Sequence, residues 1–302
     1  MPTFIHRVDD LLLFSEVVEK GGFSAAARVL NMQRSKLSRR VAELEMRLGV
    51  RLLQRNTRSV SLTPMGEQVY AHAQALAREA RTVFDLAASV GDTPAGLLRI
   101  TAPSPLAVTL LGDLVARFCL AHPNVRVLLD SRDQIIDLVA EGYDLAFRAQ
   151  GSSLTDARVN ALEVAPVPLI LVCSPAMAKS APKHPRDLAS LPLLAHATQD
   201  GVHTWRFTGP AGETESVEFQ PRSLSSNMAT LRAMARAGLG VALVPRYLSA
   251  VLLDKGDLVQ ILPAWTAPPA RIYAVMPTRR GEPLALRRFL EYAVAELPAL
   301  LA

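Results

Sequence analysis

Hydrophobic residues recur at helical intervals through the first 90 residues of the chain. Residues 8–19 have the spacing of an amphipathic helix that ends at Gly21-Gly22. Phe23-Ser24 begins a second, alanine-rich helix that reaches Leu30, with Ser24 as its expected N-cap. After a short break, a third helix runs to about Leu48. Its apolar positions predict one buried face, made of Leu37, Val41, Leu44 and Leu48.

A small hairpin and a long helix follow. Residues 51–62 alternate in polarity, which predicts two short strands with a basic tip. Thr63-Pro64 then begins a helix that continues to about Val90, because a hydroxyl cap precedes a proline at the first helical position. Apolar residues along this helix are alternately four and three positions apart, as in helices that pair. Packing on the chain's own domain is the alternative, but we expect dimerisation through Val69, Ala73, Leu76, Ala80, Val83 and Ala87.

Residues 95–302 alternate β-branched runs with helical segments, a pattern typical of α/β domains with largely parallel sheets. The expected strands are 97–102, 125–130, 144–148, 168–173, 204–208, 215–219, 240–244 and 271–276. The expected helices are 105–121, 132–141, 228–237, 245–254 and 283–297. The overall class is therefore α+β and multidomain.

Composition excludes several protein classes. Half of the 302 residues are hydrophobic, too many for a disordered chain, and two cysteines cannot build a disulfide scaffold. Polar or charged residues interrupt the apolar runs, so we expect no membrane-spanning segment. Asp9 and Asp10 lie where a signal peptide would need apolar residues, and we expect a cytoplasmic protein.

The positive charge is concentrated in one segment. Residues 28–58 contain nine basic residues against Glu43 and Glu45, a net +7, whereas the whole chain carries +5 and the other 271 residues therefore carry −2. A local basic excess of this kind is typical of a surface that meets polyphosphate, although a solvated helix face would also produce it.

The helices and hairpin around this charge favour DNA. A short helix, a tight turn and a helix with a polar, basic N-terminal end form a helix-turn-helix, whose second helix enters the major groove. A basic hairpin beside it forms a wing that contacts the backbone or the minor groove. The candidate DNA-binding residues are Ser24, Gln33, Arg34, Ser35, Lys36, Ser38, Arg39, Arg40, Arg55, Thr57 and Arg58.

The N-terminal segment resembles the LysR-type transcriptional regulators. The matching residues are Phe14, Gly22–Ala27, Leu30–Met32, Ser38-Arg39, Leu44-Glu45, Leu48-Gly49, Leu52-Leu53, Arg55, Arg58 and Leu62–Gly66. Weaker matches continue at Gly96–Ile100, Tyr143–Arg148 and Ala237–Pro245. Gln33 and Lys36-Leu37 depart from the family pattern, so base preference cannot be transferred from a relative.

The resemblance implies a winged helix-turn-helix domain, a linker helix and a two-lobed effector-binding domain similar to type 2 periplasmic binding proteins. The expected limits are 1–63, 64–91 and 92–302, with lobes of 92–166 plus 270–302 and of 167–269, and crossings near 165–168 and 267–271. The implied partners are promoter DNA, a small-molecule effector, further copies of the chain in a dimer or tetramer, and RNA polymerase. No cofactor is expected.

Polar residues at strand ends and helix starts are the candidates for holding the effector. Arg148 could clamp a carboxylate, or it could make an ordinary ion pair. The full set is Pro103, Ser104, Pro105, Ser131, Arg132, Arg148, His196, Thr198, Ser226 and Asn227.

Two other functions are alternatives. A small-molecule binding protein without a DNA role would lack the basic N-terminal segment. An enzyme would need a nucleophile and a base in the cleft. Ser104 and His196 could meet there, but no catalytic or metal-binding motif supports this alternative. Cys119 and Cys173 lie among apolar residues, which argues against a thiol redox switch.

Overall fold

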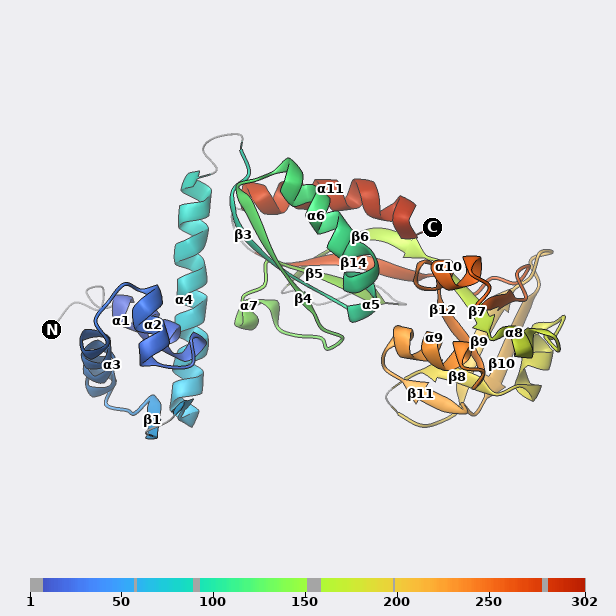
Figure 1. Cartoon of the computed structure of the whole chain (residues 1–302), viewed down its shortest axis with the longest axis horizontal. Coiled ribbons are helices and arrows are strands. Elements are labelled where there is room, and N and C mark those ends of the chain that lie inside the picture. The colour runs from blue at the N-terminus through green and yellow to red at the C-terminus, as the bar shows by residue number, and fades with distance from the viewer. Residues whose placement is uncertain are drawn as a thin grey trace. The chain divides into compact units, whose positions relative to one another are not determined.

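The computed structural model describes residues 8–56, 59–88, 93–150, 159–197, 199–278 and 282–301. The chain divides into two compact units (Figure 1). Residues up to Val90 form the first, and residues from Gly91 onward form the second, apart from the segment 136–142 that is grouped with the first. Each unit is described by itself.

The first unit consists of four helices and one hairpin within the described ranges. The elements are α1 (Val8–Glu19), α2 (Phe23–Val29), α3 (Arg34–Leu48), β1 (Leu53–Asn56), β2 (Ser59–Leu62) and α4 (Pro64–Ala88). The strands pair antiparallel, with Leu53 opposite Leu62. All predicted helices and the hairpin are confirmed.

Local chemistry explains where these elements end. Gly49 follows α3 in the left-handed conformation at φ 68°, and the N–H of Val50 donates to the carbonyl of Glu45. Thr63 Oγ1 accepts from the N–H of Gly66 at 2.9 Å and so caps α4, as expected. Ser24, in contrast, is not an N-cap: Gly22 precedes α2, and Ser24 is its second residue.

The core of the first unit differs from the expected one at Leu48. Phe14, Val17, Ala26, Leu37 and Val41 are buried together, so the inner face of α1 centres on Phe14 and Val17. Leu48 was expected in this core, but it is 45% exposed because α3 is ending there.

The N-terminal part of α4 packs on its own chain. Ala73 is 1% exposed and belongs to the core of the first unit, and Val69 packs against that core. Ala73, which was expected in a dimer seam, is thus buried within the first unit, and Val69 of the same expected seam is half-buried against that core. Val83, further along the helix, is 63% exposed.

The second unit contains two five-stranded sheets. The first has the order β4-β3-β5-β14-β6, from β3 (Gly96–Ala102), β4 (Val125–Ser131), β5 (Leu145–Gln150), β6 (Val159–Val167) and β14 (Ala270–Pro277). The second has the order β11-β8-β12-β7-β13, from β7 (Leu169–Cys173), β8 (Leu193–His196), β11 (Ser223–Ser225), β12 (Val241–Pro245) and β13 (Val259–Ile261). A separate hairpin pairs β9 (His203–Thr208) with β10 (Thr214–Phe219).

Both large sheets are mixed rather than largely parallel. β3 runs parallel to β4 and β5, whereas β14 runs antiparallel to β5 and β6. β12 is parallel to β8 and antiparallel to β7. The antiparallel strands are those beside the two crossings, at Pro168 and between Ile261 and Ala270, where the chain passes from one sheet to the other. We call the elements around the first sheet lobe I and those around the second lobe II.

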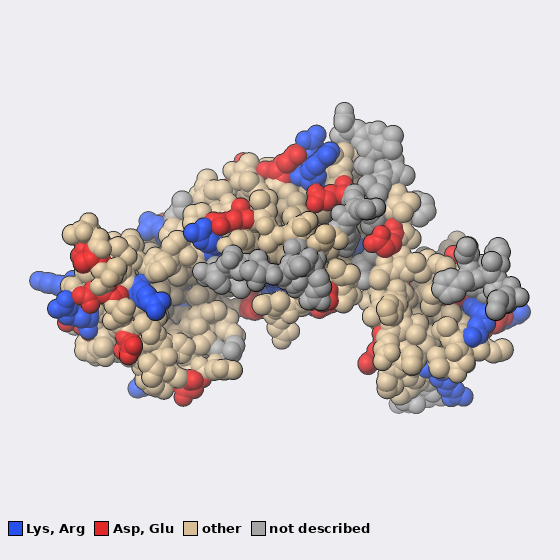
Figure 2. All heavy atoms as spheres, turned by 180° about the vertical axis from the view of Figure 1, so that it is seen from behind, with Lys and Arg blue, Asp and Glu red and all other residues tan. Residues whose placement is uncertain are grey.

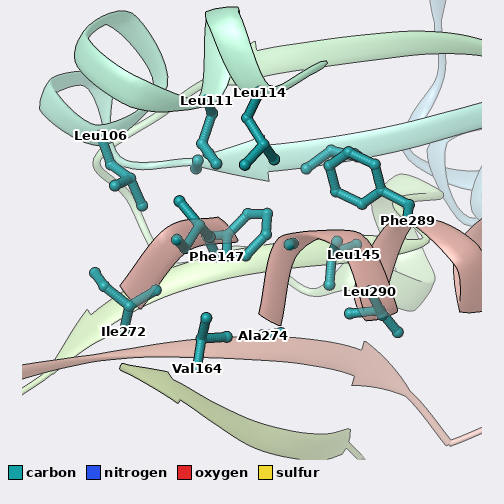
Figure 3. Packing of buried hydrophobic residues seen from close by; sticks show 14 of the residues in the cluster. Leu106, Leu111, Leu114, Leu145, Phe147, Val164, Ile272, Ala274, Phe289 and Leu290 are labelled. Carbon is teal, nitrogen blue, oxygen red and sulfur yellow. The ribbon is translucent and has the colours of Figure 1, made fainter. Parts of the chain in front are cut away.

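Helices cover one face of the first sheet (Figure 1). Residues 104–121 form one continuous helix, made of α5 (Ser104–Leu106), a π-helical turn η2 (Ala107–Leu111) and α6 (Gly112–Ala121). Together with α11 (Leu284–Leu301), it closes a core in which Leu111, Leu114, Phe147 and Phe289 pack (Figure 3).

The helix 104–121 is long and apolar enough to cross a membrane by length and composition, contrary to the sequence expectation. Its buried Leu106, Leu111, Leu114 and Phe118 belong to the core of lobe I. One face of this helix therefore packs in the core of lobe I.

Lobe II carries α8 (Pro175–Ala178), a 3₁₀ turn η3 (Pro185–Ser190), α9 (Met228–Arg236) and α10 (Arg246–Asp254). One predicted helix, over residues 132–141 of lobe I, is largely wrong. Residues 132–137 are irregular, and only α7 (Leu138–Glu141) is helical, with Asp137 capping it through the N–H groups of Val139 and Ala140.

Candidate functional site

The basic N-terminal end of α3 is the first candidate site. Gln33, Arg34, Ser35, Lys36 and Arg39 are all exposed, while Leu37 and Val41 on the opposite side are fully buried. The buried residues hold the helix on the core of the first unit and leave the polar face outward. Figure 2 shows basic side chains at the surface of this unit.

Not every arginine of α3 is free to meet a ligand. The Arg39 side chain is 81% exposed and bonds Glu43 at 2.9 Å, one turn away. Arg40 and Arg47 both bond Asp10 of α1, whose side chain is only 4% exposed. We therefore remove Arg40 from the expected DNA-facing set, because its guanidinium is bound within the first unit.

A second carboxylate connects α3 to the hairpin. Glu45 Oε1 accepts from the backbone N–H of Leu52 at 2.8 Å and of Leu53 at 3.0 Å. This contact fixes the start of β1 on α3. Arg55 lies on β1, whereas Thr57 and Arg58 lie outside the described residues. Sequence reasoning missed Asp10 and Glu45, since a carboxylate inside a basic segment gives no sign of what it binds.

The second candidate site lies where β3 and β4 end in lobe I. Pro103 and Ser104 begin the helix 104–121, and Pro105 is buried in its first turn. The N–H of Ser104 donates to Asp133 Oδ1 at 2.8 Å. Ser131 is opposite Ala102, and the N–H of Arg132 donates to the Ala102 carbonyl at 2.9 Å. The strand ends are thus tied to the segment that follows β4.

Arg132 and Arg148 hold that segment from two sides. Arg132 Nε bonds Asp130 Oδ2 at 2.5 Å, and its guanidinium lies 5.8 Å from the ring centre of Tyr143. Arg148 Nη1 donates to the carbonyl of Gln134 at 3.2 Å. Arg148 does not end its strand as expected, because β5 continues to Gln150.

Lobe II contributes the residues around the start of α9. Asn227 Oδ1 caps this helix by accepting from the N–H groups of Ala229 and Thr230, at 2.9 and 3.2 Å. Its Nδ2 donates to Asp133 Oδ2 at 2.6 Å. His196 Nε2 lies 3.0 Å from the carbonyl oxygen of Ser226, and Thr198 lies outside the described residues.

Three of the predicted residues therefore bond Asp133 or the residue beside it, which the sequence did not single out. Ser104 and Asn227 both bond Asp133, and Arg148 bonds its neighbour Gln134. The only sequence signal for Asp133 was its position two residues after Ser131, at the end of a predicted strand.

The alternative chemistries gain no support from these contacts. Across the described ranges, no hydrogen bond is found between Ser104 and His196, whose Nε2 lies 3.0 Å from the Ser226 carbonyl oxygen. Burial raises the pKa of both the Cys119 and the Cys173 thiols, which disfavours the reactive thiolate. In the same ranges, no group of three His, Cys, Asp or Glu side chains could hold a metal ion.

Comparison with known families decides between the remaining classes. Residues 8–67 match the family model of bacterial regulatory helix-turn-helix proteins of the lysR family, and residues 91–298 match the LysR substrate binding domain. The chain belongs to the LysR family. It is a DNA-binding transcriptional regulator with an effector-binding domain, and the fold class predicted from the sequence is confirmed.

Similar proteins agree over nearly the whole length. The regulator PtxR of Pseudomonas aeruginosa is 32% identical over 287 residues, which cover 94% of this chain and 91% of PtxR. CrgA of Neisseria meningitidis serogroup C is 31% identical over 292 residues, 96% of each chain. Both relatives are transcriptional regulators and neither is an enzyme.

Solved structures show the same architecture. The structure of CrgA from Neisseria meningitidis has a TM-score of 0.59 at 30% identity and covers 96% of this chain and 98% of CrgA. The full-length structure of AphB, a virulence activator of Vibrio cholerae, has a TM-score of 0.59 at 28% identity and covers 95% of this chain and 98% of AphB.

Proposed function

We propose that this LysR regulator binds promoter DNA as a homodimer or homotetramer and changes its DNA complex when a small anionic molecule binds between lobes I and II. The exposed polar and basic end of α3, held outward by buried Leu37 and Val41, is the observation that carries the DNA role. Arginine and serine at the start of a recognition helix can reach base edges and phosphates.

The DNA-facing set that we propose comprises Ser24, Gln33, Arg34, Ser35, Lys36, Ser38 and Arg39 on the helices, with Arg55, Thr57 and Arg58 on the wing. The effector set remains Pro103, Ser104, Pro105, Ser131, Arg132, Arg148, His196, Thr198, Ser226 and Asn227. A backbone N–H at a helix start, a side-chain amide and two guanidinium groups favour an anion, and a carboxylate fits them best.

The proposed assembly uses the distal half of α4, where Val83 is exposed. The domain limits of 1–63, 64–91 and 92–302 are part of the proposal, as are action in the bacterial cytoplasm and contact with RNA polymerase. Closure of the lobes on an effector would then change the orientation of the two first units of a dimer through their α4 helices. This would change the bend of the DNA or the spacing of the bound sites.

Arg34→Ala tests the DNA role. The full-length protein is first used to select bound fragments from genomic DNA, and binding of one selected fragment is then measured by fluorescence anisotropy. Loss of one base or phosphate contact should weaken binding by about 1–3 kcal/mol, and loss of a phosphate contact should lower the salt slope by about one.

Arg236→Ala is the matched control, since it removes an exposed arginine from the last turn of α9 in lobe II. It should bind the same fragment as the wild type does. Equal affinity of Arg34→Ala and the wild type at every salt concentration would refute the assigned DNA face.

A further inference from the structure

The Asp133 carboxylate hydrogen-bonds to groups on both lobes of the effector domain. Asp133 follows β4 in lobe I, and its Oδ1 accepts from the N–H of Ser104 at 2.8 Å. Its Oδ2 accepts from Nδ2 of Asn227, the cap of α9 in lobe II, at 2.6 Å. We propose that Asp133 is an internal ligand that holds the lobes together until an effector carboxylate displaces it.

Asp133 makes the contacts that a bound carboxylate would make. Hydrogen bonds to an ionised acceptor are stronger than those to a neutral one, so both donors favour a carboxylate. The N–H of Ser104 has a single hydrogen, and it can serve only one carboxylate well. An effector that uses this donor must therefore replace Asp133, and this step rests on the proposed binding of an anion between the lobes.

The segment that carries Asp133 can release it at modest cost. Asp133, Gln134 and Ile135 are exposed and lie outside any helix or strand, so few packing contacts hold them. Arg148 Nη1 bonds the backbone carbonyl of Gln134, which keeps the segment attached to β5. The Asp133 side chain can thus swing away while its backbone stays in place.

Displacement has a consequence for affinity. An effector that binds only after Asp133 has left binds with its intrinsic affinity multiplied by the fraction of molecules in which Asp133 is released. Removing the Asp133 carboxylate should therefore tighten carboxylate binding, although it removes no positive charge and adds no donor. Residues that merely shape the fold would not produce this gain.

The contact between the lobes can be tested without a ligand. In Asn227→Asp the carboxylate can still cap α9, but it donates no hydrogen bond and repels Asp133. The exchanged pair, Asp133→Asn with Asn227→Asp, restores one donor and one acceptor on the same atoms and keeps the Ser104 bond. Hydrogen–deuterium exchange of the full-length protein is followed in peptides that cover residues 103–110.

Exchange in these peptides should be faster in Asn227→Asp and return to the wild-type rate in the exchanged pair. Asn227→Asp leaves Ser104 and its acceptor chemically intact, so faster exchange there reports the lost contact across the lobes. Unchanged exchange in Asn227→Asp would overturn the proposal, and so would an exchanged pair that remains as fast as the single variant.

Displacement is tested with benzoate as the probe carboxylate and benzamide as its neutral counterpart. By calorimetry, Asp133→Ala should bind benzoate about tenfold more tightly than the wild type does, with no gain for benzamide. Asp113→Ala, which removes an exposed carboxylate of lobe I from the helix 104–121 that begins at Ser104, should match the wild type.

Equal benzoate affinity in Asp133→Ala and the wild type would overturn the displacement, as would an equal gain for benzamide or no benzoate binding by any variant. The proposed function fails by a different result, namely a DNA footprint that no bound small molecule alters. The two failures are therefore distinguishable.

Discussion

At Gly66, the absence of a side chain allows α4 to lie against the base of the wing. A Cβ built at this position would be 2.0 Å from the backbone carbonyl oxygen of Leu52, which cannot move without shifting β1. We expect Gly66→Ala to lower the free energy of unfolding of the first unit by about 1–3 kcal/mol, the usual cost of overpacking. Urea denaturation followed by circular dichroism measures the change.

Gly112→Ala serves as the control for that substitution. Its Cβ would meet its nearest neighbour, the Ala107 carbonyl oxygen, at 3.6 Å, an ordinary contact in the middle of the helix 104–121. Alanine there should leave stability unchanged or raise it by about 0.5–1 kcal/mol. If both substitutions had the same effect, the close approach at Gly66 would not be the cause.

Because Tyr247 has a raised pKa, we expect the protein to lose stability at alkaline pH. Tyr247 lies on α10, packs against the core of lobe I, and burial raises its pKa from 10.0 to about 12. Between these two pH values the unfolded chain loses the phenolic proton while the folded protein keeps it. The free energy of unfolding should therefore fall with rising pH, by about 1.4 kcal/mol per pH unit from this group alone.

Tyr247→Phe isolates that contribution, because other groups also titrate in this range. The variant should lose less stability than the wild type between pH 10 and pH 12 when thermal unfolding is compared at each pH. If the stability of both proteins fell equally with rising pH, the pKa of Tyr247 would not be raised in the folded protein.

At the scale of elements, the ion pairs of Asp10 hold α1 against α3. Its carboxylate accepts from Arg40 and Arg47, and its side chain is 4% exposed. Asp10→Asn keeps the shape but removes the charge, leaving two guanidinium groups without their anion. We expect a loss of about 2 kcal/mol in unfolding free energy, less than for a fully buried pair because both arginines are partly exposed.

Asp9→Asn is the natural comparison, since Asp9 is an exposed neighbour in the same first turn of α1. It should change stability by less than about 0.5 kcal/mol. Thermal unfolding of both variants at low and high salt separates a specific ion pair from a general charge effect, and equal losses would contradict the role of Asp10.

Element boundaries could be predicted where the deciding residues are local. Thr63-Pro64 begins α4 and Gly49 ends α3, as caps and left-handed turns require. The helix expected over 132–141 is confined to its last turn, which Asp137 caps, because Arg132, Asp133 and Gln134 bond groups outside this segment. Arg40 and Asp133 could not be assigned, since their partners lie 30 and 94 residues away.

At the scale of the whole molecule, the chain combines a basic unit with a nearly neutral one. Residues 28–58 carry the net +7, and the remainder is slightly acidic. The sequence predicted this division because charge and helical period are visible without contacts. It did not predict the mixed sheets, because the direction of β7 and β14 depends on crossings that bring distant strands together.

Assembly through α4 supplies the last prediction. Ala73 is buried in the first unit and Val69 packs against its core, so we expect a dimer to use the distal half of the helix, where Val83 is 63% exposed. Val83→Asp would place a charge in that interface and should weaken dimerisation at least about tenfold, because a buried charge opposes association. Sedimentation velocity over a range of protein concentrations measures the dimer fraction.

Val251→Asp is the matched control, as Val251 is 64% exposed on α10 of lobe II and has no place in the proposed interface. It should sediment as the wild type does. Because two recognition helices on one DNA bind far better than one, Val83→Asp should also weaken binding to the selected DNA fragment, although every residue of α3 is unchanged. If Val83→Asp remained fully dimeric, the chain would have to associate through its second unit instead.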